Sequence, residues 1–149
     1  MKLVFLCVVF GLSAPAQTKA PVVTQARLDT LTSYWQGVLK LNDWEIRTRT
    51  VRLEDLGEGE LGGSTRTPAS RLMTIRVLDP RDYAKCAEVN HLVPKSNKQI
   101  LRDIEDTIIH EIMHLRLREL VLATEYRDTV EETLVNRLTS GLLTAKYGH

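Results

Sequence analysis

The sequence has few cysteines, no excess of charge of either sign and no apolar run long enough to cross a bilayer. Its two cysteines provide neither a CxxC metal site nor a disulfide framework. The formal net charge of +1 gives no field of the kind that attracts nucleic acid or an anionic membrane. The apolar stretch near the N-terminus is too short for a stable transmembrane helix. We therefore expect no nucleic-acid partner and no stable insertion into a membrane.

The N-terminus has the pattern of a secretory signal peptide. Lys2 precedes an apolar run over residues 3–12, and Ala14-Pro15-Ala16 forms an A-x-A-like cleavage site. We predict a signal peptide over residues 1–16, a linker over 17–22 and a secreted or periplasmic protein. The alternative is a buried strand or a start codon assigned too early, which would leave the protein in the cytoplasm. Cleavage would leave Cys86 as the sole cysteine, and we expect it to be a small apolar filler.

Residues 23–149 fit one compact domain, because 43% of the chain is hydrophobic and 26% is charged. Helical spacing of apolar residues predicts a helix over residues 22–40. Alternation predicts strands over 44–50 and 71–78, with a third strand over 62–67 after a glycine-rich turn. We expect these strands to form one small antiparallel sheet.

The second half of the chain is predicted to be helical. Residues 81–96 are ambiguous and fit a short helix followed by a loop. A long helix is expected over 97–121, and its apolar face comprises Ile100, Leu101, Ile104, Ile108, Ile112 and Leu115. A last helix is expected to begin near Asp128 or Thr129 and to end near Lys146. The predicted fold is α+β, with a small sheet packed on the long core helix and one further helix at each end.

The long helix contains the motif His110-Glu111-Ile112-Met113-His114. Residues four apart lie on one face of a helix, so both imidazoles can reach one metal ion. Glu111 lies about 100° further around the helix and can act as general base on a metal-activated water. HExxH is therefore the pattern of a zinc-dependent peptidase site. The alternative is that the motif occurs by chance in a helical interaction domain.

Such a site needs a third protein ligand, and Glu131 and Glu132 are the candidates. Both also fit capping boxes at the start of the last helix. Helical geometry places Glu131 with Leu134, Val135, Leu138 and Leu142, the stripe that we expect to be most buried. Glu132 shares its face with Val135, Asn136, Thr139 and Leu143, a mixed surface of the kind that borders a polar cleft. This geometry leaves both glutamates open as the ligand.

The motif and the run from Glu132 to Thr139 resemble the gluzincin metallopeptidases. This resemblance implies that Glu132 is the third zinc ligand and that Asn136 supports it. The chain is also similar to short metallopeptidases encoded in phage and bacterial genomes, through Trp44-Glu45-Ile46, the strand at Met73, the HExxH motif and Glu131 to Val135. That similarity implies a minimal zincin-like fold in which the strand over residues 72–78 is the edge strand above the zinc helix and can bind an extended substrate.

The expected function is hydrolysis of peptide bonds in a peptide or protein substrate by a monomeric endopeptidase with one zinc ion. His110, His114 and Glu132 are the expected ligands, with Glu131 as the alternative, and Glu111 is the expected base. A non-catalytic, zinc-stabilised binding module is the alternative function. No oxyanion-stabilising residue is identified; the candidates are His91, Arg118, Tyr126 and Tyr147.

Overall fold

The computed structural model describes residues 20–57, 59–120 and 127–148, without the side chains of residues 119, 120 and 127–130. The predicted signal peptide and the start of the linker lie outside the described residues. In chain order the elements are α1 (Gln25–Val38), β1 (Glu45–Val51), β2 (Gly62–Thr67), β3 (Leu72–Leu78), α2 (Tyr83–Val89), α3 (Asn97–Leu120) and α4 (Arg127–Tyr147). The described chain is α+β, as predicted, and each predicted helix and strand is present within a few residues of its expected bounds.

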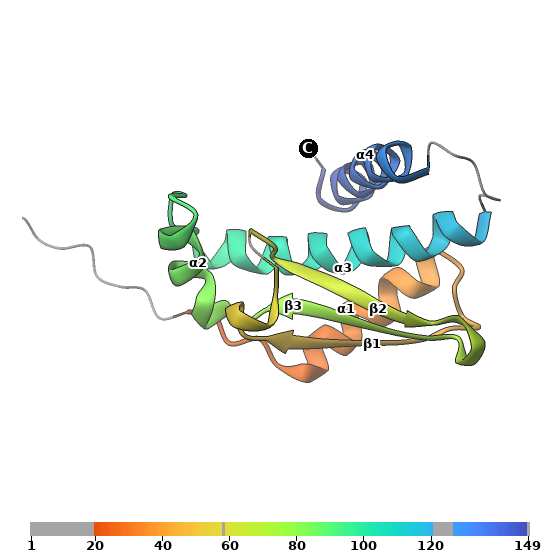
Figure 1. The fold of residues 1–149 in the computed structure, drawn as a ribbon, viewed down its shortest axis with the longest axis horizontal. Helices are drawn as coiled ribbons and strands as arrows, with labels where there is room; N and C mark the ends of the chain where they lie inside the picture. The colour runs from red at the N-terminus through yellow and green to blue at the C-terminus, as the bar shows by residue number, and fades with distance from the viewer. Residues whose placement is uncertain (1–19, 58, 121–126, 149) are drawn as a thin grey trace, which may run out of the picture.

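The three strands form a mixed sheet with the order β1-β3-β2 (Figure 1). β2 pairs with β3 antiparallel, but β1 pairs with β3 parallel. The prediction of a purely antiparallel sheet is therefore wrong. The chain leaves β1, crosses to the far side of the sheet to form β2, and returns as β3 between the other two strands. This path makes the first and third strands parallel.

β3 is the central strand because it is the most apolar of the three. Met73, Ile75 and Val77 are all fully buried on one of its faces, as the alternation predicted. The expectation that residues 72–78 form an edge strand is wrong. The edges of the described sheet are β1 and β2, and β2 contacts α3.

One hydrophobic core fills the space between the sheet and two helices, α1 and α3, which cover the same face of the sheet (Figure 1). α1 contributes Leu28 and Trp35, which are 1% and 2% exposed. Thr24 caps α1 by accepting a hydrogen bond from the backbone N–H of Arg27. Cys86 of α2 is a buried free thiol in this core, as expected of an apolar filler. None of the helices in the described ranges is both long and apolar enough to cross a membrane.

α4 packs against α3 on the side away from the sheet (Figure 1). Among the described side chains of α4, the buried ones are Val135, Thr139 and Leu143. Leu134 and Leu138 are 41% and 42% exposed, so the prediction that their stripe is the most buried one is wrong. The face that carries Glu132 is the one that turns toward α3.

Candidate metal centre

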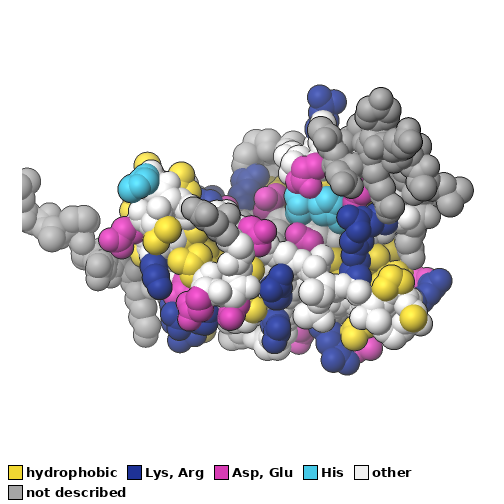
Figure 2. All heavy atoms as spheres, in the orientation of Figure 1, with side chains coloured by type: hydrophobic (Ala, Val, Ile, Leu, Met, Phe, Trp, Pro, Cys, Tyr) yellow, Lys and Arg dark blue, Asp and Glu magenta, His cyan; other side chains and the backbone are white. Residues whose placement is uncertain are grey.

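α3 has two faces with different environments. Ile108, Ile109 and Ile112 are fully buried toward the core. His110 and His114 project from another side of the helix, where their side chains retain 24% and 18% exposure. Figure 2 shows histidine side chains at the surface next to acidic ones. The pair is thus anchored by a rigid core helix and still accessible to solvent.

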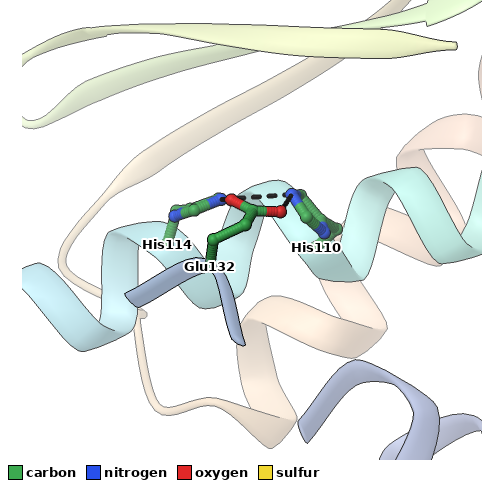
Figure 3. A group of neighbouring side chains, drawn as sticks. All are labelled: His110, His114 and Glu132. Carbon is green, nitrogen blue, oxygen red and sulfur yellow. Dashed lines mark hydrogen bonds and ion pairs between the residues drawn. The ribbon is translucent and has the colours of Figure 1, made fainter. Parts of the chain in front are cut away.

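Glu132 lies between the two histidines. Its carboxylate oxygens are 3.5 Å from Nε2 of His110 and 3.2 Å from Nε2 of His114, and the two Nε2 atoms are 3.1 Å apart. Figure 3 shows both rings on α3 directed toward the Glu132 carboxylate, which comes from α4. Three metal-binding side chains from two helices therefore converge on one point, and together they can hold a metal ion.

The three side chains offer donor atoms of the kinds that zinc binds. Zinc binds histidine nitrogen and carboxylate oxygen at about 2.0–2.1 Å, so tetrahedral ligand atoms lie about 3.3–3.4 Å apart. The two Nε2 atoms are 3.1 Å apart, and each faces a different oxygen of Glu132, Oε1 at 3.5 Å from His110 and Oε2 at 3.2 Å from His114. One donor atom from each residue lies within 4.8 Å of the other two. Two histidines and one carboxylate also leave a fourth position for water. The two histidines and the carboxylate can thus hold a metal ion.

Glu131 contacts the opposite side of His114. Its Oε1 lies 2.8 Å from Nδ1 of His114 and 2.9 Å from Nε of Arg118, which donates to it. Burial raises the pKa of Glu131, but the hydrogen bonds from His114 and Arg118 outweigh it and the net pKa is lowered. An ionised Glu131 accepts a hydrogen bond from Nδ1–H of His114, so the lone pair on Nε2 of His114 faces the point shared with His110.

Asn136 supports Glu132. Its Nδ2 donates to Oε1 of Glu132 over 3.2 Å, one helical turn away on α4. The described contact of Asn136 is with the glutamate, and the carboxylate on His114 is Glu131.

Glu111 follows His110 on α3, and its side chain contacts β2. The hydroxyl of Ser64 donates to Oε2 of Glu111 over 2.5 Å. Sequence reasoning did not identify Ser64. The alternation in residues 62–67 places Gly62, Ser64 and Arg66 on one face of that strand, but no sequence pattern shows that this face meets the HExxH helix.

Among the described candidates for an oxyanion-stabilising residue, Arg118 and Tyr147 bind carboxylates other than Glu111 and Glu132. Arg118 binds Glu131, and Tyr147 donates a hydrogen bond to Glu105. His91 lies in the turn that ends α2, where its backbone N–H donates to Glu88. Tyr126 lies outside the described residues.

Comparison of the chain with models of known protein families, with curated proteins and with solved structures finds no match.

Proposed function

We propose that this protein is a zinc-dependent metallopeptidase with a zincin-like arrangement of its α+β domain. The observation that supports this proposal best is the convergence of His110, His114 and Glu132, whose donor atoms lie within 4.8 Å of one another. Glu111 follows His110 on the same helix. The resemblance of the HExxH helix and the Glu132 region to gluzincins points to the same chemistry. The ion would be held by these three side chains.

Each residue of the site has a role in this proposal. Zinc, when bound, lowers the pKa of a coordinated water toward neutrality and polarises a carbonyl group. Glu111 takes a proton from the attacking water and passes it to the leaving amine. Glu131 holds His114 through Nδ1, and Asn136 holds Glu132, so that both ligands keep their orientation.

The substrate class that we propose is an extended peptide segment. β2 is an edge of the described sheet, and its residue Ser64 touches Glu111. A peptide that pairs with this edge gains main-chain hydrogen bonds and lies next to the proposed base. Because β3 is the central strand, we propose β2, rather than residues 72–78, as the edge strand that binds the extended substrate.

We also propose that residues 1–16 direct export and that the protein acts as a secreted or periplasmic monomer. The apolar run and the A-x-A-like site of the sequence support this. Expression of the full chain followed by N-terminal sequencing tests it. A mature chain that begins near Gln17 outside the cytoplasm supports export, and an intact N-terminus inside the cell contradicts it.

The central experiment compares the zinc-loaded wild type with Glu111→Gln on a peptide library. The expected result is that the wild type cleaves peptides, whereas the variant retains one zinc per chain and does not. Glu132→Gln is the matched control, because the same chemical change there should remove metal as well as activity. Zinc that raises the melting temperature without any cleavage by the wild type would favour the non-catalytic, zinc-stabilised module.

A further inference from the structure

β2 lies against α3 because residue 62 has no side chain. A Cβ atom at Gly62 would be 2.4 Å from Cγ2 of Thr107 and 2.5 Å from the backbone oxygen of Arg76. Real atoms do not approach so closely, and a backbone oxygen of the central strand cannot move aside easily. Gly62 therefore allows a closer approach of the edge strand to the HExxH helix than any other residue would.

The contact between Ser64 and Glu111 follows from the repeat distances of strand β2 and helix α3. Two residues along a strand return to the same face after about 6.6 Å, and four residues along a helix return to the same face after about 6 Å. The step from Gly62 to Ser64 on β2 thus matches the step from Thr107 to Glu111 on α3. The register brings the Ser64 hydroxyl to Oε2 of Glu111 at 2.5 Å.

The two partners differ in freedom of movement. Ser64 has one side-chain torsion to its oxygen, and its backbone is paired with Ile75 of the central strand. Glu111 has three side-chain torsions and extends from a helix. A hydroxyl that donates to a carboxylate forms a strong, charge-assisted hydrogen bond. The rigid partner therefore restrains the mobile one, and Oε1 of Glu111 keeps its lone pairs for another proton.

We infer that Ser64 is a positioning residue for the general base: its hydroxyl holds Oε2 of Glu111 and directs Oε1 toward the attacking water. This inference rests on the proposed peptidase function. Ser64 acts through Glu111 and touches none of the reacting atoms. Its loss should reduce the rate of the chemical step while leaving metal binding and substrate affinity in place.

Ser64→Ala tests this role. We expect kcat to fall about 10- to 100-fold, the scale of a misplaced catalytic group, with KM changed by less than about twofold. Zinc content should match the wild type. Ser64→Thr restores a hydroxyl at a strand position that tolerates β-branching, and should recover most of kcat. Ser70→Ala, the same change in the exposed turn between β2 and β3, is the matched control and should have wild-type kinetics.

A double-mutant cycle tests whether Ser64 affects kcat through Glu111. In Glu111→Asp the carboxylate is one methylene shorter and loses the contact with Ser64, so adding Ser64→Ala should change kcat less than about twofold. A fall of the same size in both backgrounds would mean that Ser64 acts elsewhere and would overturn the inference.

Crystal structures of the metal-free wild type and Ser64→Ala provide a readout that does not depend on turnover. Glu111 should have one conformer with Oε2 on Ser64 in the wild type and several conformers in the variant. If the wild type is active and Ser64→Ala is equally active, this inference is overturned and the proposed function stands. A zinc-loaded wild type that cleaves no peptide overturns both the inference and the proposed function.

Discussion

Glu131 and His114 form a hydrogen bond of 2.8 Å that joins the start of α4 to the HExxH helix. The neighbouring Glu132 faces the other nitrogen of the same ring. Two consecutive glutamates thus contact opposite sides of one histidine, one with a side chain that is 9% exposed and one that is 51% exposed. The buried carboxylate orients the ring, and the exposed one is available to a metal ion.

This division predicts different effects of the same substitution at the two positions. Glu132→Gln replaces a proposed ligand and should abolish stoichiometric zinc binding. Glu131→Gln weakens only the support of His114 and should lower zinc affinity by about 10- to 100-fold. Competition with a chromophoric chelator measures both affinities. Stronger loss in Glu131→Gln than in Glu132→Gln would reverse the assignment of ligand and support.

The close approach of β2 to α3 predicts a specific steric cost. Gly62→Ala would place Cβ in contact with Thr107 and the backbone of Arg76, and should destabilise the fold by about 1–3 kcal/mol. Gly141→Ala is the control. Gly141 lies in α4, and a Cβ there would have no atom within 4 Å apart from the backbone of its own helix. This substitution should stabilise the protein by about 0.5–1 kcal/mol. Urea denaturation of both variants measures the two effects, and an unchanged stability of Gly62→Ala would contradict the packing.

The rotation of α4 about its axis predicts which leucine matters for stability. Leu143 is 5% exposed and Leu138 is 42% exposed. Leu143→Ala should cost about 2–5 kcal/mol through lost burial and a cavity. Leu138→Ala should change stability by less than about 0.5 kcal/mol. Thermal denaturation compares the two, and the opposite order would mean that α4 presents its other face to α3.

A buried carboxylate network predicts the response to acid. Glu105 accepts hydrogen bonds from Nε1 of Trp35, Nζ of Lys146 and the hydroxyl of Tyr147. Burial raises the pKa of Glu105, but these three donors outweigh it and hold the pKa below its ordinary value of 4.5. A carboxylate with a lowered pKa stabilises the folded state above the pKa of the unfolded chain. That stabilisation is lost as the pH falls through the lower, folded pKa.

Glu105→Gln should therefore destabilise the protein at neutral pH by about 1–3 kcal/mol. The difference from the wild type should shrink as the pH falls from 4.5 through the lower, folded pKa, because the carboxylate is then protonated first in the unfolded chain and finally in the folded protein. Glu88→Gln on the exposed side of α2 is the control. Denaturation at a series of pH values measures the difference, and a gap that stays constant into acid would contradict an ionised network.

Local periodicity made the helices and strands predictable. Apolar spacing in residues 97–121 predicted a helix that the structure places at Asn97–Leu120, with Ile104, Ile108 and Ile112 in the core. Alternation predicted the buried face of β3 and even the third strand at Gly62–Thr67. The pairing of those strands could not be predicted in the same way. A strand's alternation defines its two faces but not its neighbour, so the parallel pair and the central position of β3 were missed.

The sequence by itself determined that His110 and His114 share a face of a buried helix, because residues four apart in an α-helix project in nearly the same direction. Only the tertiary structure decided how Glu131 and Glu132 divide their contacts. That division depends on the rotation of α4, which the burial of Val135, Thr139 and Leu143 against α3 sets. The contact of Ser64 with Glu111 likewise exists only because Gly62 lets β2 lie against α3. Such contacts join segments far apart in the chain, and their geometry follows from packing rather than from local spacing.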